Sequence, residues 1–131
     1  MVIADTSAWI EYFRDGSLSV VKALDYCLEY DLVGTGDLIY CEVIQGIKAD
    51  KERELVASLL QSLPRYEMVG FKIAEKAAHN FRLLRSKGIT VRKTIDVLIG
   101  TFCAENDFEL LHYDRDFTFM AEPIGLTMYV S

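Results

Sequence analysis

The sequence lacks the features that mark membrane, linker-like and disulfide-stabilised proteins. No apolar run approaches the roughly 18–20 residues that cross a bilayer, and the two prolines and eight glycines are too few for a collagenous chain or a linker. The three cysteines (Cys27, Cys41 and Cys103) lie far apart and form no CxxC pair, so neither a disulfide scaffold nor a thiolate zinc site is expected. The first residues carry an acid where a signal peptide carries basic residues, so we expect a cytoplasmic protein.

The composition is that of a folded, acidic protein. The chain has 131 residues, of which 51% are hydrophobic and 26% are charged. This length and composition predict a single domain spanning residues 1–131, with a substantial core. The formal net charge is −6, from 20 acidic and 14 basic residues. As a bulk property, this charge disfavours a nucleic-acid partner, because phosphates attract cationic proteins.

Short apolar runs alternate with longer amphipathic ones along the chain. The clearest helix is 94–106, whose apolar residues recur at positions i, i+3, i+4, i+7 and i+8. Alternation of this kind predicts an α/β protein of three layers, α/β/α, with a mostly parallel central sheet of about four or five strands. The expected strands are 1–4, 31–35, 67–69, 109–112 and 126–130. The expected helices are 6–14, one that begins at Ser17, 36–47, one from Asp50 to Pro64, 71–87 and 94–106.

Two acids directly follow expected strands. Parallel sheets bind ligands at the carboxyl ends of their strands, and these positions hold Asp5, after the first strand, and Asp114, after strand 109–112. Each also has a simpler interpretation. Asp5 suits the N-cap of the helix that follows, and Asp114 with Asp116 suits an ordinary polar turn around Arg115.

Two further acids lie within apolar helical segments. Glu42 shares a helix side with Leu38 and Ile39, and a buried unpaired carboxylate is unfavourable by several kcal/mol. It therefore needs a cation, a metal ion or a position at the edge of the core. Asp96 lies at the start of the most apolar helix, where a favourable interaction with the helix dipole is the alternative explanation.

Taken together, these carboxylates predict a metal site. Four or five acids at one sheet edge would repel one another unless a divalent cation neutralised them. An all-oxygen ligand set suits Mg²⁺ or Mn²⁺, whereas zinc prefers His or Cys. Such sites activate water for phosphodiester hydrolysis.

Four segments carry a family resemblance, in order and at the usual spacing over nearly the whole chain. They are VIADTSAWIEYF, EVIQG, GITVRKTIDVLIGTFCAENDFELL and HYDRDF. In these segments the chain resembles the PIN-domain ribonucleases, and more narrowly the VapC-type toxins of bacterial and archaeal type II toxin–antitoxin pairs.

The resemblance implies roles for particular residues. The catalytic, metal-holding acids would be Asp5, Glu42, Asp96 and Asp114, with Asp116 as a further metal ligand and Thr6 or Ser7 as an orienting hydroxyl. His112 stands where the family commonly has Thr, and Gly100 where Ala is common, but neither change removes a ligand. The resemblance also implies an RNA substrate, a cognate antitoxin whose C-terminal segment brings a basic residue near the carboxylates, and a homodimer.

The basic residues are concentrated in one stretch. Residues 76–95 contain six Lys or Arg and no acid, whereas residues 96–131 contain seven acids and one Arg. Arg92 and Lys93, just ahead of Asp96, are candidates for holding the RNA backbone. The alternative is a solvated helix face with a loop.

The leading hypothesis is therefore a metal-dependent endoribonuclease, the toxin of a pair. The alternatives are a PIN-type nuclease that processes RNA or cuts DNA, a signalling or phosphoryl-transfer domain, and a non-catalytic binding module. The aspartyl-phosphatase pattern would need a second Asp two residues after Asp5, where Ser7 stands, and a receiver domain would need a Lys near the end of the chain, where residues 126–131 have none.

Overall fold

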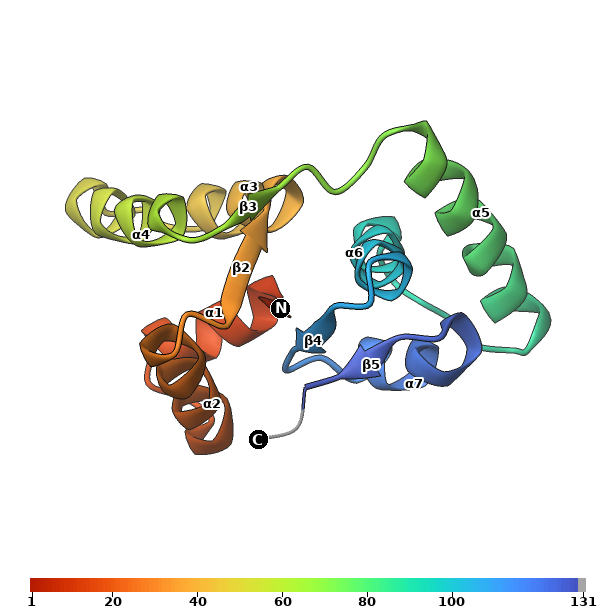
Figure 1. Cartoon of the computed structure of the whole chain (residues 1–131), viewed down its shortest axis with the longest axis horizontal. Helices are drawn as coiled ribbons and strands as arrows, with labels where there is room; N and C mark the ends of the chain where they lie inside the picture. Colours follow the sequence, from red (N-terminus) through yellow and green to blue (C-terminus); the bar gives the residue numbers. More distant parts are fainter. Residues whose placement is uncertain (130–131) are drawn as a thin grey trace.

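A five-stranded parallel sheet forms the centre of the part of the chain that the structure describes, residues 1–129 of a computed structural model (Figure 1). The strands run in the order β3-β2-β1-β4-β5, and every neighbouring pair is parallel. The expected parallel sheet is therefore confirmed. The strands are β1 (Val2–Ala4), β2 (Val33–Gly36), β3 (Arg65–Tyr66), β4 (Glu109–Leu111) and β5 (Thr127–Met128).

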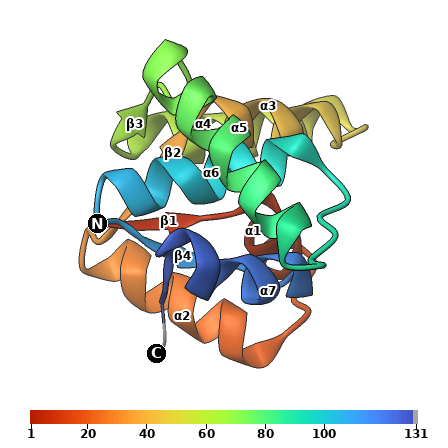
Figure 2. The ribbon, with the colours of Figure 1, turned by 90° about the vertical axis from the view of Figure 1, so that its right-hand side faces the viewer.

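Helices cover both faces of this sheet, as the three-layer prediction requires. In Figure 1, α1 and α2 lie below and to the left of the row of strands and α6 lies above it, and Figure 2 shows α2 and α6 on opposite sides of β1. None of the helices within residues 1–129 is long and apolar enough to cross a membrane. The helices are α1 (Thr6–Phe13), α2 (Leu18–Glu29), α3 (Asp37–Gln45), α4 (Asp50–Ser62), α5 (Phe71–Ser86), α6 (Thr94–Glu105) and α7 (Arg115–Ile124).

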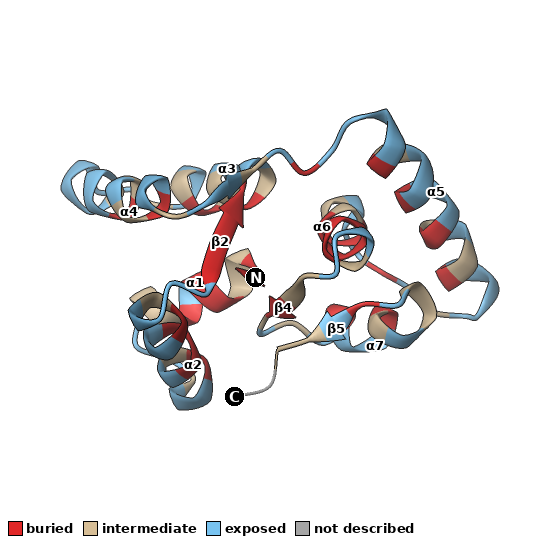
Figure 3. Ribbon diagram, viewed as in Figure 1, coloured by how far each residue is buried: buried red, intermediate tan, exposed pale blue. Residues whose placement is uncertain are grey.

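The core lies where the sheet meets the helices. All three residues of β1 are buried, because this strand has β2 on one side and β4 on the other. Trp9 of α1 and Phe117 of α7 are the largest fully buried side chains. Figure 3 shows the buried residues in the inner strands, such as β2 and β4, and on the inward faces of the helices. The strand ends, and the acids that follow them, are therefore held by a rigid centre.

Two helix ends follow directly from local chemistry. Helix α5 ends just before Gly88, whose φ of 74° is the left-handed conformation expected there. Helix α7 ends in the same way at Gly125, with a φ of 75°. The long amphipathic helices expected at 71–87 and 94–106 are thus present nearly as expected.

Some expectations about the fold were wrong. Helix α7 was not anticipated, because its first residues suggested a polar turn and Pro123 lies inside it. Strand β3 lies at Arg65–Tyr66 rather than at 67–69, where Met68 is instead buried in the core. The last strand covers only Thr127–Met128 of the expected 126–130, and residue 130 lies outside the described residues.

The buried face and the N-cap of helix α4 differ from those that its sequence pattern suggests. Val56 and Leu60 are buried, whereas Leu55, the first of three leucines spaced at i, i+4 and i+8, is 66% exposed. The N-cap is Ala49 rather than Asp50. A leucine stripe at i, i+4 and i+8 drifts around a helix of 3.6 residues per turn, and the adjacent valine faces the core instead.

Candidate metal centre

Asp5 leaves the carboxyl end of β1 and has two roles at once. Its Oδ2 accepts hydrogen bonds from the Ser7 backbone N, at 2.9 Å, and from the Ser7 Oγ, at 2.7 Å, so it is the N-cap of α1. The interpretation of Asp5 as the N-cap of this helix is therefore correct. Asp5 Oδ1 is buried and has no hydrogen-bond partner among the described residues. Burial raises the pKa of Asp5, although the hydrogen bonds from Ser7 oppose this effect.

Asp96 lies in the first turn of α6, at the same edge of the sheet. It is only 3% exposed, and its Oδ2 also lacks a partner within residues 1–129. Burial and then the negative charge of Asp5 raise the pKa of Asp96 to about 7, with smaller contributions from Asp114 and Glu42. The expected repulsion within the cluster is therefore present, and Asp5 and Asp96 contribute most to it.

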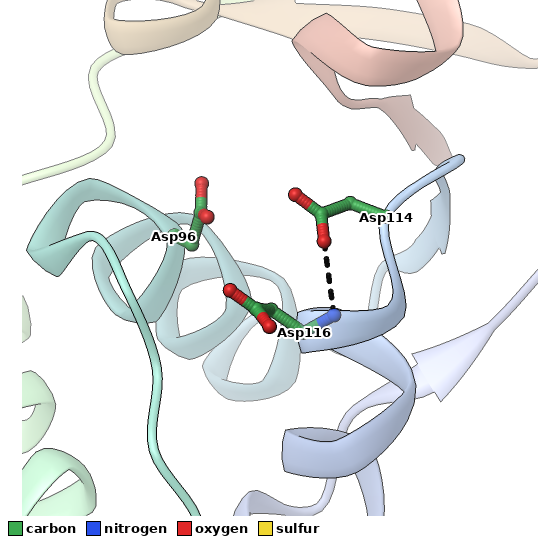
Figure 4. Close-up of side chains that lie close together, drawn as sticks. All are labelled: Asp96, Asp114 and Asp116. Atoms are coloured by element: carbon green, nitrogen blue, oxygen red, sulfur yellow. Dashed lines mark hydrogen bonds between the residues drawn. The ribbon is translucent and has the colours of Figure 1, made fainter.

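Asp114 and Asp116 begin α7, just after β4. Asp114 is the N-cap of the helix, because its Oδ1 accepts the backbone N–H of Asp116 at 3.0 Å. Oxygen atoms of Asp96, Asp114 and Asp116 all lie within 4.8 Å of one another. Figure 4 shows these three carboxylates turned toward a common space between α6 and α7. The polar-turn interpretation is correct for the capping, but these two acids also approach a third from another helix.

Glu42 lies on α3 and accepts a hydrogen bond from a hydroxyl of α1. The Thr6 Oγ1 donates a hydrogen bond to Glu42 Oε1 at 2.8 Å. Glu42 is half-buried and stands outside the 4.8 Å group, yet its charge contributes to the raised pKa of Asp96. The Thr6 hydroxyl therefore lies at the site and holds an acid in place, in the manner expected of an orienting group.

Two further side chains hold the turn that carries Asp114. The Ser7 Oγ accepts the backbone N–H of Tyr113 at 2.9 Å while it donates to Asp5, so it joins the ends of β1 and β4. His112 accepts the backbone N–H of Asp114 through its Nδ1, at 3.1 Å. Burial lowers the pKa of His112. The neutral ring, which this acceptor role requires, is thus favoured. The sequence marked His112 only as a departure from the family pattern, and its positioning role was missed.

The two basic residues ahead of Asp96 contact the site differently. The Arg92 Nε donates to Asp116 Oδ2 at 3.0 Å, and its terminal nitrogen donates to Asp114 Oδ1 at 3.1 Å. Lys93 has no such contact within residues 1–129, but its positive charge opposes the rise in the pKa of Asp5 and Asp96. The sequence placed both cations beside the acids, but it did not predict that Arg92 pairs with two of them.

The residues at this edge fit a divalent cation. The donors are carboxylate oxygens, the set that Mg²⁺ and Mn²⁺ prefer. Two of these oxygens, on Asp5 and Asp96, are buried without a partner, and such atoms are unfavourable unless a cation or a proton satisfies them. Asp96, Asp114 and Asp116 would hold the ion most directly, with Asp5 and Glu42 beside them.

The sheet and the acids at its carboxyl edge define an α/β protein with a candidate divalent-cation centre. A family model described as the PIN domain matches residues 2–123, so the chain belongs to the PIN domain family. At the level of individual proteins, it is 30% identical over 128 residues to VapC ribonuclease Mb1587 of Mycobacterium bovis and, equally, to ribonuclease VapC11 of Mycobacterium tuberculosis. In both cases 96% of each chain is covered.

Solved structures share the fold. A chain in VapBC2 from Rickettsia felis, bound to a promoter DNA fragment, superposes with a TM-score of 0.76 at 13% identity, covering 98% of both chains. A chain of FitAcB from Neisseria gonorrhoeae gives a TM-score of 0.72 at 15% identity, covering 99% of this chain and 97% of the other. The family identified from the four sequence segments is therefore confirmed.

Proposed function

We propose that this protein is a metal-dependent endoribonuclease and the toxin component of a toxin–antitoxin pair. The observation that carries the proposal is the gathering of Asp96, Asp114 and Asp116 within 4.8 Å, next to a buried Asp5 whose Oδ1 has no partner within residues 1–129. Relatives at 30% identity that are named VapC ribonucleases support the substrate class. The whole chain, residues 1–131, would act as one PIN-like domain.

The residues of the site prepare it for hydrolysis of a phosphodiester. Asp96, Asp114 and Asp116 would hold the ion most directly, and Asp5 and Glu42 would complete the set of acids around it. Bound there, Mg²⁺ or Mn²⁺ would supply an activated water and neutralise charge on the phosphate oxygens. Ser7 fixes the orientation of Asp5, and Thr6 fixes that of Glu42. The two hydroxyls at the site, on Ser7 and Thr6, each donate to an acid that would hold the ion, so water on the ion, rather than a side chain, would be the nucleophile.

The test is cleavage of RNA by purified protein and by the Asp5→Asn variant, with and without a chelator. We expect the wild type to cleave RNA only with Mg²⁺ or Mn²⁺, and Asp5→Asn to lose cleavage and growth inhibition. Asp31→Asn removes a charge from an exposed turn and is the matched control. Cleavage retained by Asp5→Asn would contradict the proposal, and cleavage of DNA but not RNA would favour the alternative nuclease class.

We further propose a protein partner, the cognate antitoxin. A groove of about 230 Å³ lies beside Glu42 and has an apolar lining that includes Ile10, Phe13 and Ile47. Ile10 is 51% exposed, which suits the apolar residues of a bound segment. Glu42 is one of the residues that line the groove, together with Glu52 and Arg14, so a basic residue of that segment could approach the carboxylates. Ile10→Asp should weaken antitoxin binding and leave RNA cleavage intact, as measured by calorimetry and a cleavage assay.

Homodimerisation is a separate proposal. A shallow groove of about 460 Å³ between α5 and α6 is lined by Ala74, Ala78, Phe81 and Leu98, among others. Small residues on a helix surface allow a second copy to approach closely. Light scattering on the purified protein tests this proposal. The described thiols are unpaired, which suits a reducing compartment, and we propose the cytoplasm.

A further inference from the structure

Arg92 pairs with two of the acids of the centre, Asp114 and Asp116, in the way that a metal ion would. Its Nε lies 3.0 Å from Asp116 Oδ2, and its terminal nitrogen lies 3.1 Å and 3.3 Å from the two oxygens of Asp114. Both acids belong to the group whose oxygens lie within 4.8 Å of one another. Arg92 therefore uses oxygens that belong to the candidate metal centre itself.

The guanidinium of Arg92 and a divalent cation would compete for the same two carboxylates. Arg does not lose its charge in proteins, so it cannot avoid repulsion from a nearby ion by releasing a proton. Asp114 Oδ1 is already shared between Arg92 and the backbone N–H of Asp116. An ion bound to the same carboxylates would therefore repel the guanidinium and replace its hydrogen bonds.

The Arg92 side chain can move away from the two acids while its backbone stays in place. Val91, the preceding residue, is buried in the core, and the Arg92 backbone N–H points at Asp116 Oδ2, at 3.4 Å. The Arg92 side chain is 61% exposed, whereas those of Asp114 and Asp116 are 17% and 6% exposed. A rotation of exposed torsions moves the guanidinium out without disturbing the acids.

We propose that Arg92 neutralises Asp114 and Asp116 while no divalent ion is bound, and moves to a phosphate of the substrate when an ion takes those oxygens. Binding of the ion and binding of RNA are then positively coupled through one side chain. A phosphate is the alternative partner that suits an arginine fork. This inference rests on the proposed nuclease function, because it assigns the released arginine to the RNA.

The first test measures the affinity of the full chain for Mn²⁺ by calorimetry. Arg92→Ala should bind Mn²⁺ about tenfold more tightly than the wild type, because the competing cation is gone. Arg115→Ala is the matched control, since it removes one positive charge from between the same two acids, from a residue with no ion pair among residues 1–129. Affinity that is unchanged or weaker in Arg92→Ala, or equally raised in Arg115→Ala, would overturn the inference.

The second test measures binding of a single-stranded RNA oligonucleotide by fluorescence anisotropy, with and without Ca²⁺ as an ion that is not expected to support cleavage. The wild type should bind RNA about tenfold more tightly with the ion than without it, and Arg92→Ala should lose most of that gain. An equal gain in both proteins would overturn the coupling. If neither protein bound any divalent ion, the proposed function would fail as well. Ion binding with no effect of Arg92→Ala would leave the proposed function standing and remove only this inference.

Discussion

The acid site has two halves that differ in how their charge is compensated. Asp5 and Asp96 are buried, and each has a carboxylate oxygen without a partner in the described structure. Asp114 and Asp116 are instead tied to Arg92 and to the start of α7. The unpaired half stores electrostatic repulsion that an ion would relieve, whereas the paired half already has a substitute cation. An incoming ion would therefore gain most from the unpaired half and would compete with Arg92 at the other.

The largest expected effect comes from removing a charge from the unpaired half. Asp96→Asn should reduce RNA cleavage by about 10³-fold, because a lost metal ligand removes several kcal/mol of transition-state stabilisation. Without metal, the variant should be at least as stable as the wild type at pH 8, since a buried charge is gone. Steady-state cleavage rates and thermal melting with a chelator measure both effects. A large loss of stability would mean that Asp96 is structural rather than a site of stored repulsion.

The same half should make the metal-free protein sensitive to pH. The pKa of Asp96 is raised from 3.8 to about 7, so between these values the folded carboxyl holds a proton that the unfolded one has lost. The stabilisation that this proton brings is complete below pH 3.8 and is lost as the pH rises through about 7. The free energy of unfolding should fall over this window by at most about 1.4 kcal/mol per pH unit.

Denaturant unfolding at several pH values, with a chelator present, measures this dependence. The difference between wild type and Asp96→Asn isolates the contribution of Asp96, because all other groups are shared. Identical slopes in the two proteins would contradict the prediction. Mn²⁺ should also bind more tightly as the pH rises through about 7, because the ion displaces the proton.

Removing the hydrogen bonds that link the two halves should have an intermediate effect on cleavage. Ser7 donates to Asp5 and accepts from the Tyr113 backbone, so Ser7→Ala removes two hydrogen bonds at the junction of β1 and β4. If the lost hydrogen bonds raise the activation free energy by about 1–2 kcal/mol, cleavage should be roughly tenfold slower. Ser7→Thr keeps the hydroxyl and should retain most of the activity. Equal rates for Ser7→Ala and the wild type would show that the halves do not depend on this bridge.

The smallest expected effect is at Glu42. Thr6→Val keeps the shape of the side chain but removes the hydroxyl that donates to Glu42 Oε1. Because Glu42 is half-buried, water can replace part of this bond, and we expect about fivefold slower cleavage, equivalent to about 1 kcal/mol. Thr6→Ser is the control. An effect as large as that of Asp96→Asn would place Glu42 among the dominant ligands.

The sequence was most informative where a periodic pattern and a strand end coincide. Helix α6 was predicted almost to its ends from its apolar spacing, and this placed Asp96 in the first turn. Asp5 and Asp114 were located because the carboxyl ends of parallel strands share one edge of the sheet. These inferences need only local pattern and topology. The wider set of roles came from the family resemblance.

The incorrect predictions arose where tertiary contacts override the local conformational preference of the sequence. Strand β3 is set by its pairing with β2, through Thr35 with Arg65, rather than by its own composition. Met68 packs against Gly36 so closely that a Cβ on that glycine would overlap its side chain, a contact that no sequence pattern shows. Arg92 was recognised as a cation near the site, but only the fold shows that two carboxylates already bind it.

The hydrogen bond between Ser7 and Tyr113 joins residues 106 positions apart, and the central strand β1 lies between β2 and β4. Strand β1, which is synthesised first, therefore cannot pair with β4 until nearly the whole chain has been synthesised. On a ribosome, Asp5 emerges long before Asp114 and Asp116, so an unfinished chain has no complete acid cluster. A nascent chain would therefore lack the candidate ion site until it is almost complete.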